Sequence, residues 1–490
     1  MNVQSKDQLP DTLINNSGIL GLFKNELKLF KAPFSERRAL LIVMDSFLVV
    51  LSVAIALYLW WIADGLTATP QRFYENWYWF LILGIGWLIL AWLNDLYDIP
   101  SANRKSLTAI RVGFVCLLML GVYFVIFFFN KDSLPRVFFL WFLVISAVLV
   151  IAWRWTYAIV FSAPPFRHRV LIIGSNERGI TIAKALRQEP LINYNILGFV
   201  DNETFTKGAK VDGVPVLGTE TDLPNLVKTL HVHEIVIAIE QDLGKDLFLW
   251  LVECQAHGVR VSWMPDLYEK ICRKVPIQHI DPAWALHAMQ DRSFMSRIQE
   301  MSKRLVDLIL VTLALPILLF IIPLIALAVK VDSKGPSFYR QIRCGRAGKT
   351  FAIYKFRTMV TDAEKDGVKW AQKNDSRITK MGRFLRKSRL DELPQLYNVL
   401  KGEMSIVGPR PERPEFIAQL EEEIPFYRTR LMVKPGITGW AQVHYDYGNT
   451  VEDALIKLQY DFYYIRYQSL ALDIYTMFRT VGVLFLLKGM

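Results

Sequence analysis

The chain has 490 residues, of which 52% are hydrophobic, and its mean hydropathy is +0.25. These values exclude an ordinary large soluble enzyme and favour a membrane protein with two or three domains. The formal net charge of +11 fits cytoplasmic flanks of membrane spans or contacts with anionic lipid and phosphate, so we expect no nucleic-acid partner. The four cysteines are scattered, which indicates neither a disulfide framework nor a zinc site.

The amino-terminal third predicts membrane spans. Residues 1–38 are polar and basic and are expected to be a cytoplasmic segment without a cleaved signal peptide. Residues 39–162 then hold apolar runs that are long enough to cross a bilayer, at about 39–62, 78–97, 109–130 and 137–162. Basic residues flank the first run, the second connection and the end of the fourth run. The positive-inside rule therefore predicts four transmembrane helices with both ends in the cytoplasm.

Residues 163–298 predict a Rossmann-like α/β domain. The stretch "RVLIIGSNERGITIAKAL" is typical of a buried strand, a glycine turn and a helix, and strands are expected near "NILGFVD", "EIVIAIE" and "GVRVSWMP". This alternation favours a parallel, doubly wound sheet. The turn offers Gly174 and Gly179, but Asn176 replaces the middle glycine of a dinucleotide fingerprint, with Asp201 near the place of the ribose-binding acid. We expect a structural or regulatory domain, with a bound nucleotide or redox chemistry as alternatives.

A fifth apolar run, Leu308 to Val329, contains Pro316 and Pro323. A proline inside a helix removes a hydrogen bond and bends the chain. A bent segment that enters and leaves by the same membrane face therefore competes with a full span. The residues alone leave the two arrangements open.

The carboxyl-terminal third is polar and basic, and it contains two adjacent acids, Asp391 and Glu392. Before them, Arg386 and its basic neighbours stand at helical spacing, which gathers positive charge suited to phosphate. Pro394 and Gly402 predict a short helix that begins at the acids. One acid could hold Mg²⁺ while the other attacks phosphorus. The alternative is an Asp that only caps the helix beside an exposed Glu.

Several ordered blocks resemble the bacterial sugar transferase family, the polyprenyl-phosphate hexose-1-phosphate transferases. They are "KRLVDLILVTLALP", "GPSFYRQIRCGRAGKTFAIYKFRTM", "NDSRITKMGRFLRKSRLDELPQLYNVLKGEMSIVGPRPERPE", "KPGITGWAQVHYDYG" and "QYDFYYI". The preceding segments resemble the undecaprenyl-phosphate glucose or galactose phosphotransferase type. The resemblance implies a four-helix transmembrane bundle, the α/β domain, and a mainly helical monotopic catalytic domain at 299–490 with a re-entrant helix at about 308–329. One departure is that this chain has prolines at 316 and 323 where the family usually has one.

The resemblance also implies the reaction. Hexose-1-phosphate would pass from a UDP-sugar, with glucose or galactose expected, to undecaprenyl phosphate, releasing UMP and initiating exopolysaccharide, capsule or O-antigen synthesis. Asp391 would form the covalent phosphosugar intermediate and Glu392 would ligate Mg²⁺. The residues expected to bind substrate phosphate are Arg410, Lys355, Arg357 and Arg386.

The implied location is the bacterial inner membrane, in contact with its lipid, with the active site facing the cytoplasm. Self-association into a homo-oligomer is expected by analogy. Two other functions stay open on the residues: a membrane scaffold, and a nucleotide-sugar-modifying protein that acts through the α/β domain. The second would need a better dinucleotide turn and a Tyr-x-x-x-Lys pair, which that domain lacks.

Overall fold

The computed structural model describes residues 34–67, 69–97, 102, 105–129, 136–161, 168–188, 194–201, 208–239, 243–290, 294–361, 377–445, 448 and 450–485. Most of the predicted cytoplasmic segment 1–38 therefore lies outside the described residues. The chain divides into two compact units. One contains the amino-terminal helices and most of the α/β sheet, and the other contains the rest of the sheet and everything described from Val261 onward.

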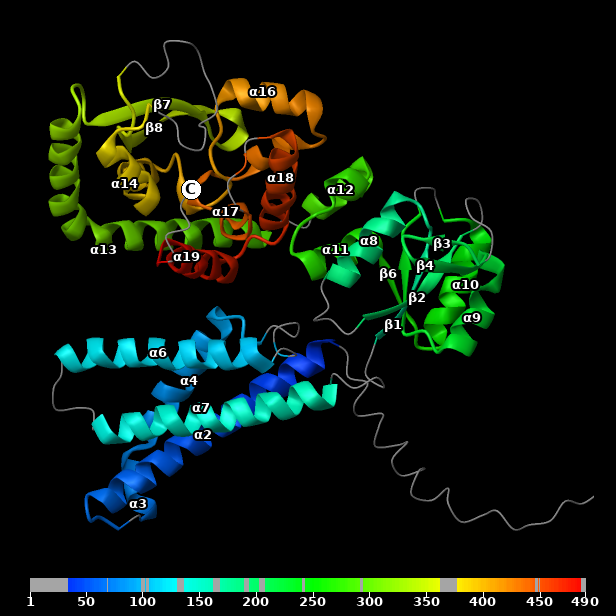
Figure 1. Ribbon diagram of the computed structural model, residues 1–490, viewed down its shortest axis with the longest axis horizontal. Coiled ribbons are helices and arrows are strands. Elements are labelled where there is room, and N and C mark those ends of the chain that lie inside the picture. The colour runs from blue at the N-terminus through cyan, green and yellow to red at the C-terminus, as the bar shows by residue number, and fades with distance from the viewer. Residues whose placement is uncertain are drawn as a thin grey trace, which may run out of the picture. The chain divides into compact units, whose positions relative to one another are not determined.

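Four apolar helices of the amino-terminal region pack around one core (Figure 1). They are α2 (Phe34–Ala63), α4 (Trp77–Leu93), α6 (Lys105–Phe129) and α7 (Arg136–Phe161), with the short α3 (Pro70–Glu75) before α4. Helices α2, α6 and α7 are long and apolar enough to cross a membrane. Helix α4 has only 17 residues because Asn94 caps it and Asp95 turns left-handed, so the run predicted at 78–97 is helical over a shorter length.

A buried ion pair joins two of these helices. Arg154 of α7 binds both carboxylate oxygens of Asp45 of α2, at 3.2 and 2.5 Å, and donates to the carbonyl of Leu96 at 2.7 Å. Both charged side chains are fully buried. Removing one partner would leave an uncompensated charge, so the pair fixes how α2 and α7 meet.

The α/β sheet has six strands in the order β3-β4-β2-β1-β5-β6. Their bounds are β1 (His168–Ile173), β2 (Tyr194–Val200), β3 (Lys210–Val211), β4 (Val214–Gly218), β5 (Glu234–Ile237) and β6 (Arg260–Trp263). The prediction of parallel pairing is confirmed for β1 with β2 and for β2 with β4. The sheet is nevertheless mixed, because β3 pairs antiparallel with β4 through a turn at Asp212 and Gly213, both with positive φ. An Asp-Gly pair is the usual signal of such a hairpin.

Helices accompany the sheet and continue beyond it. They are α8 (Glu177–Gln188), α9 (Leu223–Leu230), α10 (Lys245–Ala256), α11 (Met264–Cys272) and α12 (Pro282–Gln290). Val275, Ile277 and Ile280, which lie between α11 and α12, share a core with Ile417 and Phe462 of the carboxyl-terminal region. The chain before the predicted limit at residue 299 thus already packs on that region.

The carboxyl-terminal region is mainly helical, as predicted. After α13 (Phe294–Asp332) come the antiparallel hairpin β7 (Phe338–Cys344) and β8 (Thr350–Phe356), α14 (Lys380–Ser388), a 3₁₀ turn (Leu390–Gln395), α15 (Leu396–Lys401), β9 (Ser405–Val407), α16 (Pro414–Glu423), a second 3₁₀ turn (Tyr427–Met432), β10 (Gly436–Thr438), α17 (Trp440–His444), α18 (Val451–Arg466) and α19 (Leu470–Phe485).

Helix α13 contains the fifth apolar run and is bent. Figure 1 shows two arms that meet at a sharp bend, and Pro316 and Pro323 inside the helix supply its cause. Both arms pack on the same region: Val311 of the first arm contacts the core at Ile353, and Val329 of the second contacts the core at Phe356. Much of the opposite surface is apolar and exposed, including Leu313, Ile317, Phe320, Leu324 and Val331. This surface suits lipid.

Gly408 should tolerate no side chain, because the parallel strands β9 and β10 bring two backbones together there. A Cβ atom at Gly408 would lie 2.4 Å from the carbonyl oxygen of Lys434 and 2.9 Å from the nitrogen of Gly436. We expect Gly408→Ala to destabilise the protein by roughly 1–3 kcal/mol through overpacking. Thermal unfolding in detergent measures this. Gly244→Ala, where nothing lies within 4 Å of the added carbon, is the control, and equal unfolding temperatures would contradict the prediction.

Candidate active site

The two adjacent acids lie on the buried 3₁₀ turn that joins α14 to α15. Arg389 adopts a left-handed conformation (φ 55°) that ends α14 and starts this turn. Asp391 is 9% exposed and Glu392 is 6% exposed. The N-cap position of the turn is Arg389 and that of α15 is Gln395, so neither acid is a simple helix cap. The predicted short helix does end at Gly402, although it starts later than expected.

Glu392 is held by two cations from different elements. Its Oε1 atom accepts hydrogen bonds from Lys355 Nζ of β8 at 3.0 Å and from Arg410 Nη2 at 2.7 Å. Arg410 lies in the loop that follows β9. The structure thus brings three of the predicted site residues into direct contact, and Asp391 precedes one of them, Glu392, in the chain.

The two carboxyl groups are shifted in opposite directions. Burial and the neighbouring charge of Glu392 raise the pKa of Asp391 to about 6, against the opposing effect of Lys355, Arg410 and Arg386. Burial would also raise the pKa of Glu392, but Arg410 and Lys355 hold it well below its usual range. Two adjacent acids in different environments can take different roles. Glu392 stays ionised, and Asp391 is the more basic carboxylate.

Of the other two predicted phosphate-binding residues, Arg386 lies near the acid pair and Arg357 binds the chain at the end of α13. Arg386 donates from Nε to the hydroxyl of Thr358 at 2.9 Å, and its charge reaches Asp391. Arg357 donates from Nη2 to the carbonyl and hydroxyl oxygens of Ser333, at 2.7 and 2.8 Å, just past the end of α13. The structure therefore gives Arg357 a contact that fixes the chain after α13. Thr358 was missed by the sequence analysis, although it stands in the "KFRTM" block.

A metal would need oxygen from the substrate. Within the described parts of the chain, no cluster of three or more His, Cys, Asp or Glu side chains is arranged to hold an ion. Mg²⁺ is commonly bound through one or two carboxylates together with substrate phosphates. Asp391 and Glu392 fit that requirement, since the hydrogen bonds from Lys355 and Arg410 both go to Oε1 of Glu392.

In the α/β domain, the residues of the incomplete fingerprint bind one another. Asp201 Oδ2 accepts from the main-chain nitrogen of Ser175 at 3.0 Å and from its hydroxyl group. Asn176 Oδ1 accepts from the nitrogen of Gly179 at 3.1 Å and so caps α8. The groups that would hold a ribose and a pyrophosphate thus have partners within the protein.

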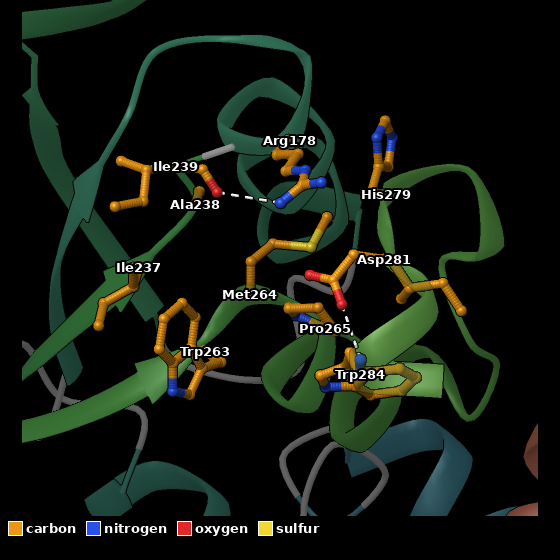
Figure 2. A pocket seen from close by; sticks show the side chains of 11 residues that line it. Arg178, Ile237, Ala238, Ile239, Trp263, Met264, Pro265, His279, Asp281 and Trp284 are labelled. Atoms are coloured by element: carbon orange, nitrogen blue, oxygen red, sulfur yellow. Dashed lines mark hydrogen bonds between the residues drawn. The ribbon is translucent and has the colours of Figure 1, made fainter. Parts of the chain in front are cut away.

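A hollow lies at the carboxyl ends of β5 and β6, the edge where α/β sheets commonly bind ligands (Figure 2). Its polar groups are already engaged. Arg178 donates to the carbonyl of Ile239 at 3.0 Å, and Asp281 accepts from the nitrogen of Trp284 at 2.7 Å. His279 also lines the hollow, and its Nε2 atom lies 3.0 Å from the hydroxyl of Thr181, which is not a lining residue. These contacts do not form a catalytic set.

Substituting the two acids should change stability in opposite directions. Because the pKa of Asp391 is raised above its ordinary value of 3.8 to about 6, its ionisation increasingly disfavours the folded state as the pH rises from about 4 to 6, and the penalty is complete above that range. Asp391→Asn should therefore stabilise the protein by up to about 3 kcal/mol at pH 8, with the gain shrinking as the pH falls from 6 to 4. Glu392→Gln should destabilise it at pH 8, because Lys355 and Arg410 lose their acid.

Thermal unfolding of both variants and the parent in detergent, between pH 4 and 8, tests this pair. The two substitutions are adjacent and nearly isosteric, so each serves as the control for the other. Shifts of the same sign at pH 8 would show that the acids do not differ as described.

Two family models match the chain. One, described as bacterial sugar transferase, covers residues 298–486, and the other, described as a CoA-binding domain, covers residues 92–265. The first therefore includes most of α13 and the acid pair. The second includes the α/β sheet and two of the amino-terminal helices.

Curated relatives match much of the chain. It is 38% identical over 261 residues to the UDP-N-acetylgalactosamine-undecaprenyl-phosphate N-acetylgalactosaminephosphotransferase of Aeromonas hydrophila, covering 53% of this chain and 60% of that one. It is 37% identical over 313 residues to the UDP-glucose:undecaprenyl-phosphate glucose-1-phosphate transferase of Xanthomonas campestris pv. campestris, covering 62% and 64%. The protein of the same name from Klebsiella pneumoniae is 33% identical over 374 residues, covering 74% and 78%. The matches thus span less than two thirds of the first two relatives and over three quarters of the third. The chain belongs to the bacterial sugar transferase family.

Proposed function

We propose that this protein transfers a sugar 1-phosphate from a UDP-sugar to undecaprenyl phosphate and releases UMP. The observation that carries the proposal is the buried acid pair, in which Glu392 is neutralised by Lys355 and Arg410 while Asp391 keeps the more basic carboxylate. Family membership and the relatives' names support the same reaction. The product would be the first lipid-linked intermediate of a polysaccharide.

Asp391 would act as the nucleophile of two successive displacements. In the first, a carboxylate oxygen of Asp391 bonds to the phosphorus that bears the sugar, and the bond from that phosphorus to UMP breaks with its electron pair leaving on UMP. In the second, an oxygen of undecaprenyl phosphate bonds to the same phosphorus and the Asp391 carboxylate leaves. A carboxylate with a pKa near 6 is ionised at neutral pH yet is a better nucleophile than an ordinary aspartate.

The cations around the pair would stabilise charge on the phosphates. Arg410 is about one-third exposed, at 34%, so its guanidinium can meet a substrate while it contacts Glu392. Glu392 and the substrate phosphates would hold Mg²⁺, which supplies further charge neutralisation when bound. Arg386 supports the site through its charge, and a phosphate contact of Arg357 remains a prediction.

The donor class is a UDP-hexose. Glucose or galactose was the expectation, and the relatives' names refer to UDP-glucose in two cases and to UDP-N-acetylgalactosamine in another. N-acetylgalactosamine therefore joins the candidates. The predicted homo-oligomer and the scaffold alternative remain predictions. The nucleotide-sugar-modifying alternative gains no support, because the residues of the incomplete dinucleotide fingerprint hydrogen-bond to one another.

We further propose that α13 is re-entrant, so that the site faces the cytoplasm of the bacterial inner membrane. The bend and the packing of both arms on one region support this arrangement. A straight helix of 39 residues could cross the bilayer, but its two halves could not both pack on the residues of strand β8.

Release of UMP tests the reaction. Protein purified in nanodiscs is given Mg²⁺, undecaprenyl phosphate and UDP-glucose, UDP-galactose or UDP-N-acetylgalactosamine in turn. We expect one donor to give release that depends on the lipid, and Asp391→Asn to lower it by at least about 10³-fold because the nucleophile is lost. Asp266→Asn, an exposed acid on α11, is the matched control. No release from any donor, or equal release by the Asp391 variant, would favour the scaffold instead.

Cysteine labelling tests the membrane arrangement. Single cysteines at Met301 and Val360, on either side of the apolar part of α13, should react with a membrane-impermeant maleimide in inside-out vesicles and stay unlabelled in intact spheroplasts. Leu66→Cys, in the connection after α2 that is predicted to lie outside, should show the opposite pattern. Labelling of Val360→Cys in spheroplasts would mean that α13 crosses the membrane.

A further inference from the structure

Four consecutive carbonyl oxygens in the loop after β9 each accept a hydrogen bond. The bonds run from Gly436 N to Pro409 O (2.9 Å), from Arg430 Nη2 to Arg410 O (3.0 Å), from Arg343 Nη1 to Pro411 O (3.2 Å) and from Cys344 N to Glu412 O (2.9 Å). The donors come from the second 3₁₀ turn, β7 and β10. Pro409 and Pro411 of this loop are buried, and a buried carbonyl group needs a hydrogen-bond partner, so the four bonds fix the main chain of the loop at each of these residues.

The fixed segment is the one that presents Arg410. Pro409 and Pro411 flank it, and proline restricts φ and has no N–H with which to form a regular ladder. The position of the Arg410 main chain therefore depends on donors to its carbonyls. That position in turn decides whether the Arg410 side chain reaches Glu392, which it contacts at 2.7 Å.

Arg430 is itself tightly held. Its side chain is only 7% exposed, and the same Nη2 atom that binds the Arg410 carbonyl donates to Asp461 Oδ2 of α18 at 3.0 Å. Nη1 donates to the hydroxyl of Tyr427, and Glu412 lies 3.9 Å away. A buried guanidinium needs such partners, and they leave it little freedom. Asp461 belongs to the "QYDFYYI" block. The contacts among Asp391, Glu392, Lys355 and Arg410 do not involve this block and so do not explain what it does.

We propose that Arg430, held by Asp461, is a positioning residue for the transfer reaction. It fixes the Arg410 main chain so that the Arg410 guanidinium meets Glu392 and the donor phosphates. The inference rests on the proposed function, and it assigns Arg430 no contact with substrate. It goes beyond core stability, because the effect of Arg430 must pass through the Arg410 side chain.

A double-mutant cycle separates these two roles. Arg430→Lys keeps the positive charge beside Asp461. It loses the planar guanidinium group, which donates hydrogen bonds to Asp461, Tyr427 and the Arg410 carbonyl at the same time. In the parent protein, we expect Arg430→Lys to lower kcat/KM for the UDP-sugar by about 10- to 100-fold, mainly by raising KM. The reason is that a small displacement of the Arg410 guanidinium weakens its contact with the donor phosphates. In the Arg410→Ala background, the same substitution should cost less than about threefold.

Equal losses in both backgrounds would mean that Arg430 does not act through Arg410, and would overturn the inference. Thermal unfolding of each variant shows whether it is folded. If Arg430→Lys fails to fold, Asp461→Asn, which weakens the hold on Arg430 and keeps a hydrogen-bonding oxygen, enters the same cycle with the same criterion. Arg428→Lys, an exposed arginine two residues earlier, should change neither kcat nor KM.

The result also distinguishes this inference from the proposed function. A parent protein that releases no UMP from any donor refutes the proposed function and the inference with it. A parent that releases UMP, with additive losses in the cycle, refutes only the positioning role.

Discussion

The shared contact of Lys355 and Arg410 with one oxygen of Glu392 is the constraint on which the transferase region depends. The three residues come from β8, the 3₁₀ turn and the loop after β9, so three separate elements must meet at one buried atom. Losing one cation would leave charge buried without its partner. Strand β8 carries Lys355 and also packs on both arms of α13, through Ile353 on one and Phe356 on the other. The membrane helix and the active site are therefore supported by the same strand.

The environment of the acid pair explains why adjacent residues can differ in chemistry. Successive side chains of a turn point in different directions, and among the residues that the structure describes Glu392 receives direct hydrogen bonds from Lys355 and Arg410. Asp391 experiences the cations at longer range while it bears the full effects of burial and of the Glu392 charge. The nucleophilic role proposed for Asp391 would gain from that balance, because the charges that favour its ionised form act on it at longer range.

Local features of the sequence predicted much of this arrangement, but the sequence did not predict which distant residues pair with one another. The prolines of α13, the basic face of α14 and Gly402 act within one or two helical turns, so their effects are visible in the letters. The partner of Arg357 depends on where the chain turns after α13. Arg430 and Asp461 are 31 positions apart, and Asp45 and Arg154 are 109 apart, so only tertiary packing pairs them. The antiparallel β3 had a local signal, Asp212-Gly213, that the strand pattern overlooked.

The two cations on Glu392 differ in what they can do when a donor arrives. The Lys355 side chain is 19% exposed. Burial lowers the pKa of Lys355, and the neighbouring charge of Glu392 is the main effect that keeps the lysine protonated. Arg410 is more exposed, and a guanidinium presents five N–H groups in a planar fork, so it can bind a phosphate without leaving Glu392. In the proposed reaction, Lys355 would therefore set the charge of the site before substrate binds, whereas Arg410 would link the acid to the substrate. Such a link would work only if the Arg410 main chain does not move, so in the proposed reaction the anchoring of four successive carbonyls in that loop would bear on catalysis as well as on folding.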